Sequence, residues 1–147
     1  MNQDAIAMLD ADHQRVEALF KEYQSAGNDM TRKNDLAQLI CMELTLHAML
    51  EEEIFYPAFR QATGDNELVQ EAEQEHEEAK QLIARIQSGQ ADDATVLELQ
   101  KAVQHHVQEE RDEMFSKARS AQGLDLAGLA QQMESRKREL VSAPQGA

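Results

Sequence analysis

The sequence predicts an all-α protein: an antiparallel up-down-up-down four-helix bundle with a short extra C-terminal helix. Three observations support this prediction. Helix-favouring residues dominate the 147-residue chain, which has only 6 glycines, 2 prolines and no tryptophan. Apolar residues recur every three or four positions through four long stretches, as on the buried face of a helix. Short segments containing glycine and aspartate separate these stretches, and short connections favour antiparallel neighbours.

The first expected helix covers residues 3–25, because apolar side chains recur there at helical spacing and a glycine-containing break follows. The second is expected to begin at Thr31 or Asn34. Pro57 lies late in this second helix. It should bend or end the helix near residues 53–54, because proline has no N–H and its ring clashes with the preceding turn.

The third expected helix covers residues 66–87. Asp65 precedes it and is a suitable N-cap, because its carboxylate can accept hydrogen bonds from the free N–H groups of the first turn. For the same reason the fourth helix is expected to begin after Asp92 or Asp93.

The chain is expected to have two parts. Residues 1–122 form the four-helix bundle, and residues 123–147 form a shorter amphipathic helix, over about residues 124–140, followed by a flexible tail. The extra helix either lies across the bundle or makes a dimer contact. We therefore expect a monomer or a homodimer.

Composition argues against several classes of function. The net charge is −14, from 28 acidic and 14 basic residues, which disfavours binding to nucleic acid or to an anionic membrane surface. The first residues, MNQDAIAML, lack the basic start and long apolar run of a signal peptide, and no segment resembles a membrane span. Cys41 is the single cysteine and lies among apolar residues at helical spacing, so we interpret it as a packing residue. A cytoplasmic protein is expected.

Histidine and glutamate interrupt two of the apolar stripes at the same spacing. His47 precedes Glu51 by four residues, and His106 precedes Glu110 by four residues, 59 positions later. On a helix this spacing places an imidazole and a carboxylate on one face, one turn apart. Burying an isolated carboxylate is costly unless the group is paired or coordinates a metal. The two pairs therefore predict metal ligation.

Single histidines occupy the stripes of the first and third expected helices. A lone histidine on an apolar face is more often a hydrogen-bonded core residue, but here each of the four long helices carries one. The adjacent His105 shares the phase of the polar side of its helix, so periodicity selects His106 instead. Inward side chains on facing helices of a bundle build metal sites. The predicted metal ligands are His13, His47, Glu51, His76, His106 and Glu110.

Four imidazoles and two carboxylates suit iron, manganese or zinc. Two near-octahedral ions have about twelve coordination positions, and the imidazoles, two bridging carboxylates and a bridging oxide or hydroxide leave roughly two open. Open positions distinguish a reactive site from a structural one. No nucleophile with an attendant base and no phosphate-binding glycine loop occurs in the sequence, so any catalysis rests on the metal.

Four segments resemble the motifs of hemerythrin-like, or HHE cation-binding, domains over about residues 4–119. They are DHQRVEALF, HAMLEEEIFYPAF, QEHEEAKQLI and HHVQEERDEMF. The resemblance implies an antiparallel four-helix bundle around a non-haem di-iron centre, with the six residues named above as ligands. Its two iron ions would be bridged by oxide or hydroxide and by carboxylates, and zinc or manganese can substitute. Domains of this type bind oxygen reversibly, react with nitric oxide or peroxide, sense oxygen or iron, or take part in repair of iron–sulfur clusters.

The chain departs from the oxygen-carrier pattern at one position. Oxygen carriers of this family have a second histidine four residues after that of the third helix, and here this residue is Lys80. His105 brings the number of histidines to five but lies on the wrong face unless a bulge distorts its helix. We expect the missing imidazole to leave one iron with an extra labile position, which favours redox reaction over reversible oxygen storage.

Two functions from different classes follow. The first is a di-iron protein that binds or reacts with oxygen, nitric oxide or peroxide, in oxidative or nitrosative stress or in iron–sulfur cluster repair. The alternative is an iron sensor or iron-delivery module that acts through a protein partner without gas chemistry. A metal-free structural bundle is disfavoured, because burying six unligated polar groups costs on the order of several kcal/mol. A ferritin-like oxidase would carry Glu-x-x-His on two helices, and this chain has the reverse order.

Overall fold

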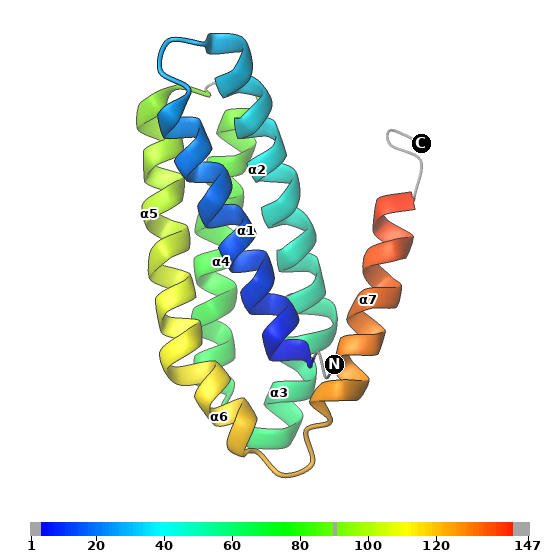
Figure 1. The fold of residues 1–147 in the computed structure, drawn as a ribbon. Coiled ribbons are helices and arrows are strands. Elements are labelled where there is room, and N and C mark those ends of the chain that lie inside the picture. Colours follow the sequence, from blue (N-terminus) through cyan, green and yellow to red (C-terminus); the bar gives the residue numbers. More distant parts are fainter. Residues whose placement is uncertain (1–3, 90, 143–147) are drawn as a thin grey trace.

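The computed structural model describes residues 4–89 and 91–142, and four long helical rods run antiparallel through it (Figure 1). This arrangement confirms the predicted all-α bundle. The rods are, in order, α1 (Ala5–Ser25); α2 (Met30–Leu50) with η1 (Glu51–Phe55) and α3 (Tyr56–Thr63); α4 (Asn66–Gln87); and α5 (Asp93–Glu109) with η2 (Glu110–Met114) and α6 (Phe115–Ser120). A further helix, α7 (Leu126–Ser142), follows the bundle. Residues 143–147 of the predicted flexible tail lie outside the described residues.

An aspartate caps the first turn of each rod. Each carboxylate accepts a hydrogen bond from the backbone N–H three residues further on, at 2.8–3.1 Å. The caps are Asp4, Asp29, Asp65 and Asp92. The predicted cap at Asp65 is confirmed. The second helix begins slightly earlier than expected because Asp29 already satisfies its free N–H groups.

The second rod continues past Pro57 instead of ending before it. A π-helical turn, η1, lies directly in front of the proline, and there the N–H of Tyr56 bonds to the carbonyl of Glu51, five residues back. This wider turn removes the need for the α-helical hydrogen bond that Pro57 cannot donate. The fourth rod has the same kind of π-helical turn at η2, where the N–H of Phe115 bonds to the carbonyl of Glu110, although no proline follows directly. Both π-helical turns begin at the glutamate of a His-x3-Glu pair, and such turns are frequent at functional sites.

Two hydrophobic clusters fill the bundle, one toward each end. One includes Phe20 and Leu99, and the other includes Leu9 and Phe59. The predicted ligands lie between these clusters, so each end of the bundle shields the middle from water. Cys41 is fully buried in the first cluster, and burial raises the pKa of its thiol to about 11, which agrees with a packing role.

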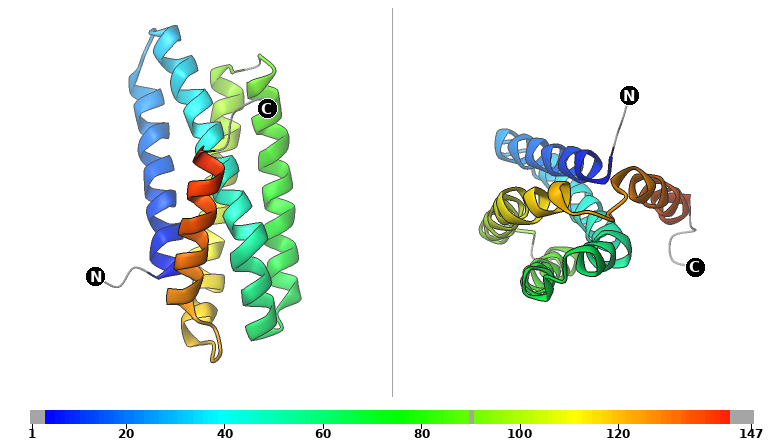
Figure 2. Two further views of the ribbon diagram at one scale, coloured as in Figure 1. Left: turned by 90° about the vertical axis from the view of Figure 1, so that its right-hand side faces the viewer. Right: turned by 90° about the horizontal axis from the view of Figure 1, so that it is seen from below.

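Helix α7 lies along the outside of the bundle, against α1 and the second rod (Figure 2). Its buried residues are Leu129, Ala130 and Met133, and Arg136 donates a 2.8 Å hydrogen bond to Glu53. Helix α7 thus packs on the bundle of its own chain, and a dimer contact through this helix stays an expectation. A division of the chain near residue 122 remains our proposal.

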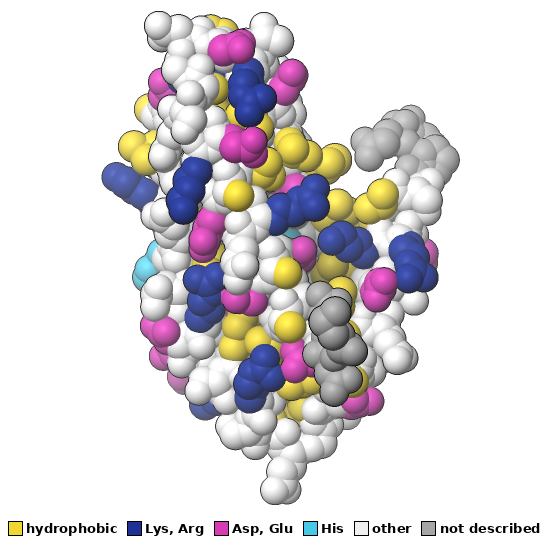
Figure 3. All heavy atoms as spheres, in the orientation of Figure 1, with side chains coloured by type: hydrophobic (Ala, Val, Ile, Leu, Met, Phe, Trp, Pro, Cys, Tyr) yellow, Lys and Arg dark blue, Asp and Glu magenta, His cyan; other side chains and the backbone are white. Residues whose placement is uncertain are grey.

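Two surface properties bear on partners. In the described part of the chain, no helix combines the length and apolar character needed to cross a membrane. Basic and acidic side chains are interspersed over the face seen in Figure 3, with no large area of one sign. The basic patch typical of nucleic-acid binding is therefore not found on this face.

Candidate metal centre

The six predicted ligands converge in the middle of the bundle. Each of these residues is at most 9 % exposed to solvent. In contrast, the side chain of His105 is 65 % exposed, as its phase on the helix predicted. The π-helical turn at η2 begins only after His106, so it does not turn His105 inward.

One set of four side chains comes from α1, the second rod and η2. The Nε2 atoms of His13 and His47 are 3.1 Å apart. His47 Nε2 lies 3.2 Å from Glu51 Oε1, and His13 Nε2 lies 3.1 Å from Glu110 Oε1. These atoms belong to a group whose ligand atoms all lie within 4.8 Å of one another.

A second set uses the same two glutamates with the histidines of α4 and α5. The Nε2 atoms of His76 and His106 are 3.2 Å apart. His76 Nε2 lies 3.0 Å from Glu51 Oε1, and His106 Nε2 lies 3.1 Å from Glu110 Oε2. Glu51 and Glu110 are thus shared by both sets, as two carboxylates that bridge a pair of ions would be.

The donor spacing fits metal ions. Ligands at about 2.1 Å in neighbouring positions of an octahedron lie roughly 3.0 Å apart, close to the distances within both sets. Two buried carboxylate oxygens, Oε2 of Glu51 and Oε1 of Glu110, accept no well-aligned hydrogen bond, although His13 Nε2 lies 3.1 Å from the second of them. An unsatisfied buried carboxylate oxygen is costly, and a cation at the centre would satisfy both.

Each of the four imidazoles directs its other nitrogen at a carboxylate outside the centre. The Nδ1 pairs are His13–Asp10 (3.4 Å), His47–Asp12 (3.1 Å), His76–Glu52 (2.7 Å) and His106–Glu75 (2.8 Å). A carboxylate that accepts from Nδ1–H fixes the tautomer in which Nε2 carries a lone pair. The four inward Nε2 atoms are therefore prepared for metal binding.

These carboxylates were missed by sequence reasoning. The helical phase of Glu52, one residue after Glu51, predicts a solvated side chain, and this prediction is wrong because the second rod turns Glu52 toward α4. Asp12 and Glu75 each directly precede a ligand histidine, so each is offset from it around the helix and reaches the histidine of the next rod. This position, one residue before a predicted ligand histidine, is the one feature of the sequence that could have pointed to these two carboxylates. Glu43 lies one turn before His47 in the sequence, a spacing suited to a partner of the centre, but its carboxylate pairs instead with Arg15 at 3.2 Å.

The clustering of Tyr56 with Phe55 and Phe59 in the sequence predicts a core residue at the bundle end, but the Tyr56 hydroxyl lies at the centre. It donates a 2.7 Å hydrogen bond to Glu110 Oε2 and lies 3.2 Å from His76 Nε2. Burial raises the pKa of this phenol well above its ordinary value, and the charges of Glu51 and Glu110 raise it further. Lys80 donates a 3.0 Å hydrogen bond from Nζ to Glu52 and is one of the residues that line a cavity beside the histidines. The set that contains His76 and His106 thus has a phenol beside it and no third imidazole.

Without a metal, the buried charges neutralise one another. Burial lowers the pKa of His47, but the carboxylates of Glu51 and Asp12 outweigh it and raise the pKa to about 10. Burial raises the pKa of Glu51, but His47 and neighbouring groups hold it well below its ordinary value. Metal binding must therefore displace a proton from His47.

An apolar cavity adjoins the four histidines on the side of the first cluster. Its volume is about 150 Å³, and Ile83, Val103 and Val107 are among the residues that line it. A water-sized molecule needs about 10–15 Å³ by a comparable measure, so the cavity has room for a small ligand beside the centre.

Comparison with known proteins agrees with this arrangement. The family model for the hemerythrin HHE cation-binding domain matches residues 4–118. A crystal structure of a hemerythrin HHE cation-binding domain-containing protein from Mycobacterium kansasii has the same fold. The TM-score is 0.76 at 20% identity, and the match covers 93% of this chain and 86% of that chain.

Two curated relatives are longer proteins. One from Nostoc sp., named DNA nickase, is 34% identical over 122 residues, which cover 80% of this chain and 33% of that protein. An uncharacterized hemerythrin-like protein from Schizosaccharomyces pombe is 27% identical over 105 residues, which cover 67% of this chain and 51% of that protein. The chain thus spans between a third and about half of the length of these relatives. Because the family model covers the whole described bundle nearly end to end, the chain belongs to the hemerythrin HHE cation-binding domain family.

Proposed function

We propose that the protein is a non-haem di-iron protein whose centre binds or reacts with oxygen, nitric oxide or peroxide. The observation that carries the proposal is the pair of four-residue sets that share Glu51 and Glu110. Two ions, each with two imidazoles and two shared carboxylates, account for all six side chains and for the two unpartnered oxygens.

The donor chemistry supports iron. Imidazole and carboxylate together suit iron, and zinc or manganese can occupy the same donors. Bound iron supplies redox activity and open positions for small ligands. Each imidazole would be held by its Nδ1 carboxylate, which raises the basicity of the ligating nitrogen.

Two features of the chain favour redox reaction over oxygen storage. Lys80 leaves the set of His76 and His106 without a further imidazole, and the Tyr56 hydroxyl lies beside that set with its proton directed at Glu110. The Tyr56 proton is thus held at the centre on the side of the second cluster, and the cavity reaches the histidines from the side of the first. The apolar lining of the cavity keeps bulk water away from the histidines.

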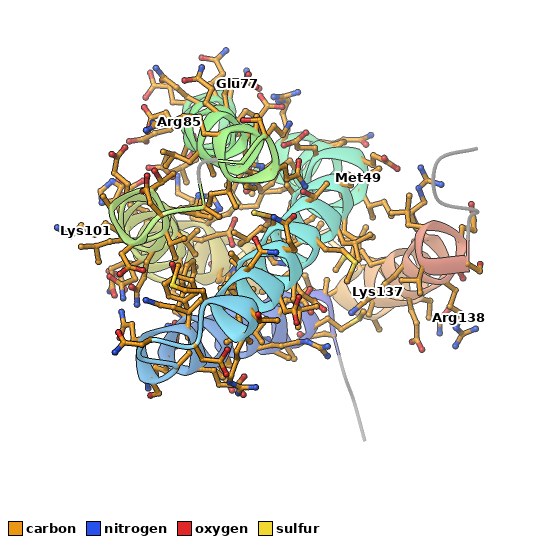
Figure 4. The ribbon with its side chains drawn as sticks, turned by 90° about the horizontal axis from the view of Figure 1, so that it is seen from above. Met49, Glu77, Arg85, Lys101, Lys137 and Arg138 are labelled. Atoms are coloured by element: carbon orange, nitrogen blue, oxygen red, sulfur yellow. The ribbon has the colours of Figure 1, made fainter. Side chains whose placement is uncertain are left out.

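The decisive experiment is anaerobic reconstitution with ferrous iron, followed by metal analysis and optical spectra after addition of oxygen and then nitric oxide. We expect about two iron ions per chain, one for each ligand set, and an oxygen-dependent charge-transfer band. Glu51→Gln should lower the iron content, because both sets use Glu51. Glu77→Gln is the matched control, since Glu77 lies on the outer side of α4 (Figure 4).

Two results would contradict the proposal. One iron ion per chain, or a preference for zinc in a mixture of both metals, would show that the centre is not a di-iron centre. Stable, repeated oxygenation and deoxygenation would instead show that the protein stores oxygen.

A second function is iron sensing or iron delivery through a protein partner. The lengths of the relatives favour it, because the matched segment makes up only 33% and 51% of those proteins and is joined there to further chain. Ready release of iron to a chelator, with no spectral response to oxygen or nitric oxide, would identify this function. The net charge of −14 supports the inference that this domain itself does not contact DNA.

A further inference from the structure

A third group of metal-binding side chains lies on the surface, outside the centre. It consists of His105, Glu109 and Glu75, and its ligand atoms all lie within 4.8 Å of one another. His105 Nε2 is 3.0 Å from Glu109 Oε1 and 3.4 Å from Glu75 Oε2. We call these three residues the surface cluster.

The surface cluster repeats the spacing of the buried ligands. His105 and Glu109 are four residues apart, as are His106 and Glu110 directly after them in the segment HHVQEE. On a helix the two pairs are rotated from one another by one residue, so one faces the core and the other faces solvent beside α4. The chain thus presents two His-x3-Glu pairs from one helical turn.

Glu75 connects the surface cluster to the centre. Its Oε2 faces His105, and its Oε1 accepts a 2.8 Å hydrogen bond from His106 Nδ1. A narrow crevice of about 10 Å³ lies between α4 and α5 at the same place, and both Glu109 and Glu110 line it. The crevice therefore begins beside the surface cluster and ends at ligands of the centre.

The donor set is suited to a transition-metal ion in transit. One imidazole and two carboxylates are typical donors for divalent first-row ions, and three protein ligands leave positions open to water. Glu71 also lines the crevice and adds negative charge at its mouth. Negative charge around a narrow opening raises the local concentration of cations.

We propose that the surface cluster binds a divalent transition-metal ion and that the crevice beneath it is the route by which ions enter the centre. Binding at the surface cluster stands on its own geometry. The entry route rests on the proposed function, because it requires a metal centre to be filled.

The binding part is tested in protein whose centre is first filled with ferrous iron under argon and which is then freed of loosely bound iron by desalting. Manganous ions added to this protein are counted with electron paramagnetic resonance. His105→Ala and Glu109→Gln should each bind one manganous ion fewer than the parent protein, or bind it at least ~10-fold more weakly. Glu98→Gln is the matched control, because Glu98 is exposed on the same face of α5. Equal manganous binding by all four proteins would overturn the proposal. The comparison between variants does not depend on how many irons the centre holds.

The entry part is tested by the rate of iron uptake into metal-free protein at limiting ferrous iron. We expect His105→Ala to reach the same final iron content as the parent protein roughly tenfold more slowly. An unchanged rate in a variant that has lost the manganous ion would refute the entry route. A final iron content below two per chain in the parent protein would instead count against the di-iron centre. The manganous-ion count would still show whether the surface cluster binds a metal ion.

Discussion

Replacing Asp12 by asparagine should weaken the binding of one of the two metal ions that we propose for the centre and leave the binding of the other unchanged. Asp12 lies on α1, and its carboxylate holds Nδ1 of His47 at 3.1 Å. Asparagine keeps the size and an oxygen acceptor but removes the charge that fixes the tautomer and raises the basicity of Nε2. Helix α7 supports this carboxylate, since Lys137 lies 3.6 Å from it and is on the side of α7 that faces the bundle (Figure 4).

The size of the effect follows from the role of Asp12. Loss of a carboxylate that orients a ligating histidine costs about 10–100-fold in metal affinity, which is about 1.4–2.7 kcal/mol. Only the set that contains His13 and His47 should be affected, because His76 and His106 are oriented by Glu52 and Glu75. The variant should therefore bind its two ions in two separate steps.

A competitive chelator titration with zinc, followed by metal analysis, measures this separation. Asp35→Asn is the control, because Asp35 is exposed on α2 and its substitution removes the same charge from the chain. The reasoning is refuted if Asp12→Asn binds both ions within about twofold of the parent protein, or if both steps weaken equally.

Three further predictions follow from the same geometry. Tyr56→Phe should lower the free energy of unfolding of the metal-free protein by about 1–3 kcal/mol, because Glu110 loses its 2.7 Å hydrogen bond; urea unfolding measures it, and an unchanged midpoint would contradict it. Met133→Ala should cost about 2–5 kcal/mol in the same assay because Met133 is fully buried on the face of α7 that packs against the bundle, whereas Met30→Ala, at a 69 % exposed residue, should change stability by less than about 0.5 kcal/mol. The pKa of His47 rises from 6.5 to about 10 on folding, so its contribution to the stability of the metal-free protein is complete below pH 6.5 and is lost as the pH rises to about 10. Unfolding of metal-free parent protein and of His47→Gln at several pH values tests this, and a parent-minus-variant difference in stability that does not shrink with rising pH would refute it.

The sequence by itself determined the elements and their buried faces. Apolar spacing and aspartate caps depend only on the geometry of single helices, so the third helix was predicted at the residues where it occurs, 66–87. The same periodicity separated the buried His106 from the exposed His105, because one residue shifts a side chain by about 100° around the helix. The convergence of six side chains followed from having one inward histidine on each of four neighbouring rods.

Only the tertiary structure decided which side chains meet across helices. The pairing of Asp12 with His47 and the place of Tyr56 beside Glu110 depend on the rotation and register of packed rods, which local spacing does not contain. Tyr56 has the spacing of an ordinary core residue, and the π-helical turn at η1 directly precedes it in the second rod. Packing likewise decides the position of α7 and the cavity beside the histidines. It also places Glu75 between the surface cluster and His106. Helical periodicity fixes the face on which a residue lies, and the packing of whole helices fixes what that face touches.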